Sequence, residues 1–399
     1  MLYRPFGNTG EKVSILGFGA MRLPVIDHHH DQIDVKTATE MLHYALDHGV
    51  NYVDTAYVYH GSSFTSPGNS EGFVGEALQG GYRDKVMVAT KLVGWSVESR
   101  EDMDRVLAEQ LANLQSEYVD CYLLHGIDAA GWERFRELGA LDFLTSAKAD
   151  GRIRFAGFSF HDDGPAFKPI VDGYDWDFCQ IQYNFMDVDY QAGREGLRYA
   201  AERGLGVIVM EPLKGGRLAD PVPDEVGRIW EEAPIKRSAA EQALRFVWDD
   251  PDVSLLLSGM STMEQVVENV RIAGEAEPRS LDEADLDLIE KVRSVYSERT
   301  LVPCTDCRYC MPCPEGIDIP KVLGIMNDAS LYDDWMGAGF LYNMVSGDMG
   351  GTAKASVCTE CRQCADACPQ QIDVPEMMAE CVRRFEEEAP NLPEETAVD

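Results

Sequence analysis

Basic residues are scarce in this chain of 399 residues. It has 35 Lys and Arg against 69 Asp and Glu, which gives a formal net charge of −34. A charge of this sign repels phosphate backbones and anionic lipid headgroups. Nucleic acid is therefore not expected as a partner, and we interpret the acidic balance as a strongly solvated surface.

Long apolar runs are also lacking. No stretch approaches the roughly 18 apolar residues that a membrane-spanning helix needs. The N-terminal MLYRPFGNTGEKVSILG has no basic segment followed by an apolar stretch, so no secretion signal is expected. We therefore expect a cytoplasmic protein that does not bind membranes. Its eleven cysteines are then not expected to form disulfides, because the cytosol keeps thiols reduced.

Short apolar segments rich in β-branched residues recur through the first 300 residues. They are VSILGFG, NYVDTA, VMVATKL, YVDCYLLH, IRFAGFSF, FCQIQYN, GVIVMEP and VSLLLSG. Stretches between them, such as TATEMLHYALDHG, have helical spacing. About eight strand-helix pairs of this kind predict a closed (β/α)8 barrel. A doubly wound open sheet is the alternative, but no G-x-G-x-x-G opens a helix after the first strand.

Polar residues stand at the ends of three successive predicted strands. Asp54 ends the second segment and Tyr59 follows it, Lys91 ends VATK, and His125 ends YLLH. Taken singly, these residues are explained as a helix cap, a lysine reaching for solvent and a hydrogen-bonded core histidine. In a (β/α)8 barrel, however, the carboxyl ends of the strands carry the active site. Together the four residues therefore predict a catalytic group.

The segments DTAYVY, ATK and LLHG resemble the catalytic tetrad of the aldo-keto reductases. GFGAMRLP, GFS, QIQYN, EPLKGG and SGMSTMEQVVENV extend the resemblance over roughly residues 2 to 298. It implies a TIM barrel in residues 1–298 that reduces a small carbonyl, or oxidises an alcohol, with NAD(P)H. The nicotinamide-cofactor contacts that it implies are Ala20, Met21, Ser159, Gln180, Met210, Gly259, Glu268 and Asn269.

In the tetrad that this resemblance implies, each residue has a distinct chemical task. Reduction of a carbonyl needs an acid beside the developing alkoxide, and a phenol of ordinary pKa is a reluctant donor at neutral pH. The Lys91 ammonium would favour the phenolate of Tyr59 and so make Tyr59 a better acid. Asp54 would anchor Lys91, and His125 would orient the carbonyl oxygen. No Lys or Arg lies between Gly259 and Asn269, which favours NADH unless another segment supplies a charge for a 2′-phosphate.

Three further features lie near this predicted site. His60 and His161 are close enough to line a substrate pocket, although solvated loop histidines are the ordinary interpretation. DHHHD at residues 27–31 is interpreted as a solvated turn. SSFTSPGNS, which starts at residue 62, is rich in turn formers and is expected to form a rim or lid of the pocket.

Two cysteine runs follow the predicted barrel, CTDCRYCMPCP from residue 304 and CTECRQCADACP from residue 358. CPEGIDIPKVL after the first run is echoed by CPQQIDVPEMM after the second. The spacing C-x2-C-x2-C-x3-C-P is typical of [4Fe-4S] clusters that take a fourth ligand from the other run, although the first run has only two residues before its last cysteine. Two clusters are predicted, with ligands Cys304, Cys307, Cys310 and Cys368, and Cys358, Cys361, Cys364 and Cys313.

Zinc is the alternative to iron-sulfur clusters, but its cysteine pairs are usually separated by a longer gap. We expect a ferredoxin-like, mainly α-helical domain in residues 299–385 and a disordered acidic tail in 386–399. Cys121, Cys179 and Cys381 fit neither run and are expected to be buried. Because oxygen damages exposed clusters, an anaerobic or microaerobic source is expected.

Three functions remain open from the sequence. Nicotinamide transfers two electrons as hydride, whereas a [4Fe-4S] cluster accepts one, so the two need a relay such as a flavin or a substrate radical. The first function is a carbonyl reductase or alcohol dehydrogenase with structural or sensing clusters. The second is an electron-transfer oxidoreductase with a flavin or substrate relay and a ferredoxin-like redox partner. The third is a docking scaffold, which an intact tetrad disfavours.

Overall fold

The computed structural model of the chain describes residues 1–387, except residues 28, 62–65, 163 and 347–350. The described residues fall into two compact units. We call residues 1–214 and 237–286 the barrel unit, and residues 215–236 together with those from 287 onward the C-terminal unit. The predicted acidic tail lies outside the described residues from residue 388.

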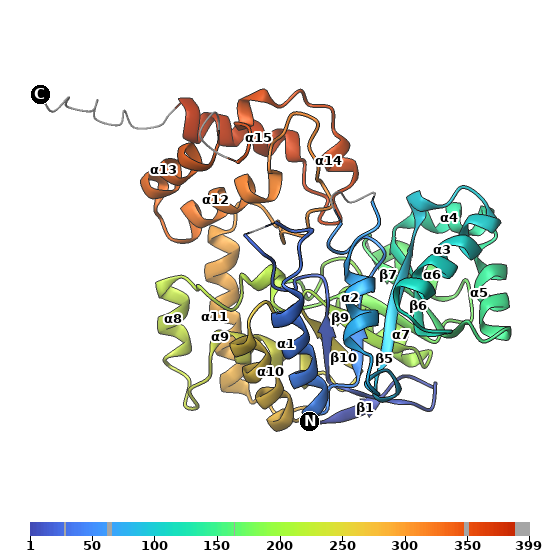
Figure 1. Cartoon of the computed structure of the whole chain (residues 1–399). Coiled ribbons are helices and arrows are strands. Elements are labelled where there is room, and N and C mark those ends of the chain that lie inside the picture. The colour runs from blue at the N-terminus through green and yellow to red at the C-terminus, as the bar shows by residue number, and fades with distance from the viewer. Residues whose placement is uncertain (28, 62–65, 163, 347–350, 388–399) are drawn as a thin grey trace, which may run out of the picture. The chain divides into compact units, whose positions relative to one another are not determined.

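Eight parallel strands close into a barrel in the barrel unit (Figure 1). This confirms the predicted (β/α)8 fold, and each of the eight apolar segments overlaps one strand of the barrel. Burial of the strands on both faces explains their nearly continuous apolar sequence. In barrel order the strands are β10 (Leu255–Ser258), β3 (Leu16–Gly19), β4 (Tyr52–Asp54), β5 (Met87–Val93), β6 (Val119–Ile127), β7 (Ile153–Phe160), β8 (Phe178–Gln182) and β9 (Gly206–Met210).

Amphipathic helices alternate with these strands, and several begin at a side-chain cap. Ser99, Ser238 and Thr262 each accept a hydrogen bond from a backbone N–H three residues on, which satisfies a donor that the first helical turn leaves open. The helices of the barrel unit are α1 (Val35–Asp47), α2 (Ser70–Ala77), α3 (Arg100–Asn113), α4 (Ala129–Glu137), α5 (Ala140–Ala149), α6 (Gly164–Val171), α7 (Gly193–Glu202), α9 (Ala239–Asp249) and α10 (Met263–Glu275).

A short hairpin closes the amino-terminal end of the barrel. Its strands β1 (Tyr3–Pro5) and β2 (Lys12–Ser14) are antiparallel, so the predicted first strand VSILGFG is in fact divided between β2 and β3. Phe6 in the hairpin packs on Phe178, with ring centroids 5.3 Å apart, and a Cβ on Gly206 would lie only 2.5 Å from its ring. The strands begin around this plug, which leaves their carboxyl ends for a site.

The C-terminal unit is mainly helical. It contains α8 (Asp224–Trp230), most of α11 (Glu283–Arg299), α12 (Ile319–Leu331), α13 (Trp335–Val345), α14 (Gln363–Asp366) and α15 (Val374–Val382). Buried side chains of α12, α13 and α15 share one apolar core. The sequence repeat is also structural. Asp318 caps α12 and Asp373 caps α15, and each cap is followed by a proline in the first helical turn. Among the described residues, no helix is long and apolar enough to cross a membrane.

Candidate functional site

The four predicted tetrad residues come together at the carboxyl ends of β4, β5 and β6. Nζ of Lys91 donates to both carboxylate oxygens of Asp54, at 2.7 and 2.8 Å, and to the Tyr59 hydroxyl at 3.1 Å. It also donates to the backbone oxygen of Thr55 at 2.7 Å. The His125 ring lies edge-on to the Tyr59 ring, with centroids 6.1 Å apart.

Parallel register explains why these residues meet. Asp54 of β4 pairs with Ala89 of β5, and Lys91 lies two residues further along the same face. Lys91 in turn pairs with Leu123 of β6, and His125 again lies two residues further along. Because side chains alternate across a strand, each step of two residues keeps the side chain directed into the barrel.

Burial governs the electrostatics of the Asp54–Lys91 pair. It raises the pKa of Asp54, which the Lys91 charge opposes, and it lowers the pKa of Lys91, which the carboxylates of Asp54 and Glu71 oppose. Short hydrogen bonds to both carboxylate oxygens compensate the two buried charges, so we treat the pair as ionised. Lys91 is therefore a cation in contact with the Tyr59 hydroxyl.

His125 is a neutral side chain at pH 7. Burial, followed by the charge of Lys91 and the neighbouring His161, holds its pKa well below the ordinary value. A neutral imidazole can orient an oxygen by hydrogen bonding but has no spare proton to give at this pH. Between the two side chains, Tyr59 is thus the better candidate for the acid.

Behind β5 lies a buried carboxylate that the sequence did not single out. Glu71, in the first turn of α2, accepts hydrogen bonds from Thr90 Oγ1 at 2.5 Å and from Gln110 Nε2 at 2.8 Å. Asn113 donates to its other oxygen at 3.2 Å, and Gln110 also donates to the backbone oxygen of Lys91 at 3.0 Å. An acidic residue in a first helical turn usually faces solvent, so sequence gave no signal for this network.

Replacement of Glu71 by alanine is expected to destabilise the fold by about 3 kcal/mol, because buried donors of Thr90 and Gln110 would lose their charged acceptor. Urea unfolding followed by tryptophan fluorescence measures the loss. Glu76→Ala, on the exposed face of the same helix, is the matched control and should leave the midpoint nearly unchanged. Equal midpoints for the two variants would contradict a stabilising role of the Glu71 network.

Three of the predicted cofactor residues lie together at the ends of β7, β8 and β9. Ser159 and Gln180 are register partners, and Gln180 Nε2 lies 3.5 Å from the sulfur of Met210. The Ser159 hydroxyl accepts a hydrogen bond from the backbone N–H of Gly126 at 2.6 Å, which fixes its position.

The remaining predicted cofactor residues occupy other elements. Ala20 is buried beside the tetrad, since its N–H donates to the backbone oxygen of Asp54 at 2.8 Å, and Met21 follows it, half-buried. Gly259 follows β10, and a Cβ there would lie 3.0 Å from the side chain of Arg22. In α10, Glu268 accepts a hydrogen bond from Ser238 at 2.7 Å, and Asn269 donates one to Ser258 at 3.1 Å. As cofactor contacts, all of these residues stay predictions.

The two histidines outside the tetrad have different surroundings. His60 is buried with its Nδ1 2.7 Å from the backbone oxygen of His30, while its Nε2 accepts from the Leu23 N–H at 3.3 Å. Both ring nitrogens thus have backbone partners, which indicates a structural role. His161 is half-buried and lies near His125. Burial lowers the pKa of His60 and that of His161 to about 4. The predicted lid falls partly on residues 62–65, outside the described residues, as does His28 of the triple-His loop.

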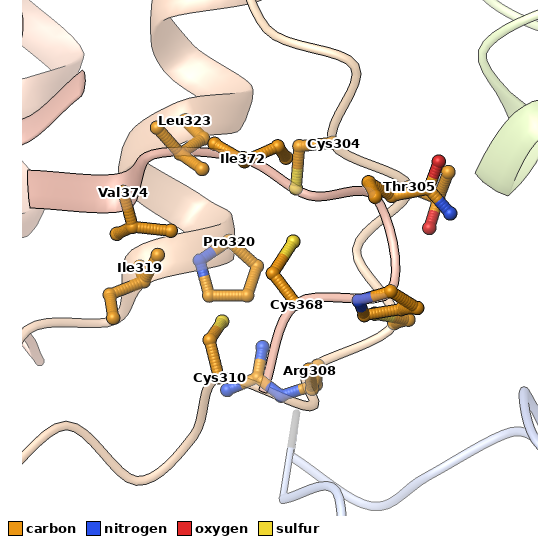
Figure 2. Close-up of a pocket in the computed structure, with 13 residues that line it drawn as sticks. Cys304, Thr305, Arg308, Cys310, Ile319, Pro320, Leu323, Cys368, Ile372 and Val374 are labelled. Atoms are coloured by element: carbon orange, nitrogen blue, oxygen red, sulfur yellow. The ribbon is translucent and has the colours of Figure 1, made fainter. Parts of the chain in front are cut away.

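The first predicted group of cysteines lines one pocket in the C-terminal unit (Figure 2). The pocket encloses about 310 Å³, open mouth included, and its wall contains Cys304, Cys307, Cys310 and Cys368. Apolar side chains complete much of the wall, among them Pro320, Leu323 and Ile372. Figure 2 shows Cys304 and Cys310, from the first run, and Cys368, from the second, around this space.

Three members of the second predicted group lie near one another. Burial, together with the nearby thiols of Cys313 and Cys358, raises the pKa of Cys364 to about 11. The fourth member, Cys361, is exposed, whereas Cys304 of the first group is buried. The donor set of each group, thiols from both runs, fits a [4Fe-4S] cluster. Within the described ranges, no three His, Cys, Asp or Glu side chains converge as a single metal ion requires.

The cysteines outside the runs are also placed by the structure. Cys121 and Cys179 lie in the barrel strands β6 and β8, and Cys381 lies in α15. All three are fully buried, as the sequence predicted. Burial raises the pKa of each thiol above its ordinary value, so these side chains serve as small apolar core residues.

Two family models match consecutive parts of the chain. The model of the aldo/keto reductase family matches residues 15–293, and that of the 4Fe-4S dicluster domain matches residues 303–372. A solved relative is the aldo-keto reductase AKR11C1 from Bacillus halodurans in its holo form. It is 27% identical, with a TM-score of 0.58, over 73% of this chain and 96% of that one.

Curated relatives of this chain have different names. L-galactose dehydrogenase of Arabidopsis thaliana is 28% identical over 72% of this chain and 93% of its own length. The 6-dehydroglucose reductase of Novosphingobium aromaticivorans is 28% identical over 55% of this chain and 71% of its own length. A probable voltage-gated potassium channel subunit beta of A. thaliana is 25% identical over 68% of this chain and 90% of its own length. The relatives thus include two oxidoreductases and a protein named for a channel.

Proposed function

Because the chain belongs to the aldo/keto reductase family and carries a 4Fe-4S dicluster domain, we propose that it is an oxidoreductase whose barrel interconverts a small carbonyl and its alcohol with a nicotinamide cofactor. One observation carries this proposal above the others. The buried Lys91 ammonium contacts both the Asp54 carboxylate and the Tyr59 hydroxyl, which is the arrangement that proton transfer to an alkoxide needs.

The tetrad residues would divide the work as follows. A bound nicotinamide would supply hydride to the carbonyl carbon. Tyr59 gives its hydroxyl proton to the carbonyl oxygen, and the resulting phenolate is stabilised by Lys91. Asp54 holds the ammonium in place, while neutral His125 hydrogen-bonds the same oxygen and sets its direction. In the oxidative direction Tyr59 takes the proton back from the alcohol.

For the cofactor itself, we propose NADH as the preferred form. The segment from Gly259 to Asn269 contains no Lys or Arg. One cation that packs against it is Arg22, which forms an ion pair with Glu211 at 3.5 Å. Because the Glu211 carboxylate offsets the Arg22 charge, this surface would hold a 2′-phosphate weakly.

A second candidate function is electron transfer between the clusters and an external redox protein. The observation that favours it is the exposure of Cys361 in the second cysteine group, because electron exchange with another protein needs a cluster near the surface. A one-electron relay, flavin or substrate radical, would then be required between hydride and cluster.

An anaerobic titration of the purified protein with NADH and NADPH separates the two candidates. The broad cluster absorption and the electron paramagnetic resonance signal report cluster reduction, and dithionite is the positive control. We expect NADH to reduce a carbonyl substrate, with a lower Kd than NADPH, and to leave the clusters oxidised. Reduction of the clusters by nicotinamide would instead establish the electron-transfer function and an internal relay.

A further inference from the structure

Arg217 lies within the stretch matched by the barrel family but folds into the C-terminal unit. It follows β9 closely, in the connection that leads to α8. Nη1 of Arg217 forms an ion pair with Asp328 of α12 at 3.1 Å. The backbone oxygen of Arg217 accepts a hydrogen bond from the Tyr296 hydroxyl of α11 at 3.1 Å. A Cβ on Gly324 would lie 3.3 Å from Nη2, so the glycine leaves room for the guanidinium across α12.

The same connection packs against the first cysteine run. Gly215 has φ +70°, and a Cβ on it would lie 2.5 Å from the backbone oxygen of Thr305. Thr305 stands between Cys304 and Cys307, and all three residues line the cysteine pocket. Leu323, which precedes Gly324, lines the pocket as well. Contacts on both sides of the connection therefore hold Arg217 beside the wall of this pocket.

The charge of Arg217 lies beside the first cysteine group. Its Nη2 lies against Gly324, the residue after Leu323, and Leu323 and Cys304 line the same pocket. Its ion pair cancels the charge only in part, because the Asp328 side chain is 54% exposed and the Arg217 side chain 22%. The carboxylate is thus screened more strongly by water than the guanidinium is. The pocket therefore experiences a net positive field from this pair.

The repeat provides no counterpart to Arg217. Arg308 in the first run lines the pocket and pairs with Asp318 and Asp306, and Arg362 in the second run pairs with Asp373, so each copy of the repeat has an arginine of its own. Arg217 comes from the barrel sequence and belongs to neither copy of the repeat. Its effect is therefore expected at one group of cysteines and not at the other.

We propose that Arg217 sets the reduction potential of the cluster held by Cys304, Cys307, Cys310 and Cys368. The inference rests on the [4Fe-4S] assignment but not on the reaction in the barrel. A cluster gains one negative charge when it takes up one electron, so a nearby cation stabilises the reduced state and raises the potential. Arg217 thus acts on the cluster through its electrostatic field and need not contact the iron.

The test is a potentiometric titration of the anaerobic, iron-loaded protein, followed by electron paramagnetic resonance. Arg217→Gln should shift the equilibrium of one cluster signal toward the oxidised state by three- to tenfold, which is a midpoint lowered by about 30 to 59 mV at 59 mV per tenfold for one electron. Arg217→Lys keeps the positive charge, so its midpoint should stay close to that of the wild type. Arg228→Gln, at an exposed arginine of α8 in the same connection, is the matched control and should shift neither signal.

A second variant covers the case in which Arg217→Gln fails to load iron. Asp328→Asn removes the carboxylate and leaves the guanidinium, so it should raise the same midpoint. Unchanged midpoints in an iron-loaded Arg217→Gln protein would overturn the proposal, as would a fall or no change in Asp328→Asn. Absence of iron from the wild-type protein would overturn it through the cluster assignment. The carbonyl activity of the barrel enters none of these readouts, so failure here is distinct from failure of the proposed function.

Discussion

Tyr59→Phe is expected to reduce carbonyl turnover by about 10²- to 10⁴-fold, which is the range that a positioned acid contributes. The phenyl ring would keep the packing against His125 but would have no proton to give to the alkoxide. Lys91 would keep its bonds to Asp54 and to the Thr55 backbone, so the fold should persist. Nicotinamide affinity and iron content should remain close to those of the wild type. Steady-state kinetics, cofactor binding and iron analysis check these outcomes.

The chain offers a matched control for this variant. Tyr57, two residues earlier in the same turn, directs its hydroxyl to Glu109 at 3.0 Å rather than to Lys91. Tyr57→Phe also removes one phenolic oxygen, yet it should leave kcat within a few-fold of the wild type. A Tyr59→Phe protein that still reduced its carbonyl at the rate of Tyr57→Phe would show that another group is the acid.

Acidification from pH 7 to pH 5 is expected to lower the free energy of unfolding by about 4 kcal/mol through His60 and His161. His60 and His161 each have a folded-state pKa of about 4, below the ordinary value of 6.5. Below pH 6.5 the unfolded chain binds a proton at each site that the folded chain does not bind. Stability is therefore complete above pH 6.5 and falls as the pH drops toward 4, by about 2 kcal/mol for each histidine at pH 5.

Urea unfolding at several pH values between 7 and 5 measures this slope. Asp and Glu side chains titrate mainly below that window, so relief of the acidic self-repulsion adds little there. His161→Gln should remove its own part of the slope, about 2 kcal/mol at pH 5, whereas His29→Gln, at an exposed histidine, should leave the slope intact. A wild-type stability that stayed constant over the window would contradict neutral burial of these rings. Burial of His125 acts in the same direction and can only steepen the fall.

The barrel could be predicted from sequence because its signals are local. Strands that are buried on both faces have short apolar sequences. Parallel register then places Asp54, Lys91 and His125 at one end of the barrel. The first strand was predicted too long, since the turn between β2 and β3 is also apolar and buried. The 4Fe-4S dicluster domain could be predicted for a similar reason, because the spacing of cysteines in each run is a local property of the chain.

Glu71 and Arg217 could not be predicted, and both depend on contacts far apart in sequence. Glu71 has the position of an ordinary first-turn carboxylate, and only packing against Thr90 and Gln110 makes it a core residue. Arg217 stands in a barrel connection, and its partner Asp328 lies beyond the first cysteine run. Neither residue type nor spacing distinguishes these two from solvated charges, whereas burial and partners do.

The connection of residues 215–236 bears on how such a protein can be divided. Its contacts with Thr305, Asp328 and the Tyr332 hydroxyl all lie in sequence added after the barrel. A shortened chain that ended near residue 298 would keep Leu218 and Val226, buried in the full chain, but would lose those partners. The barrel and the ferredoxin-like domain are consecutive in sequence, yet a connection of the barrel sequence takes part in the packing of the C-terminal unit. A cut near residue 298 therefore divides one compact unit, because residues 215–236 fold with the residues from 287 onward.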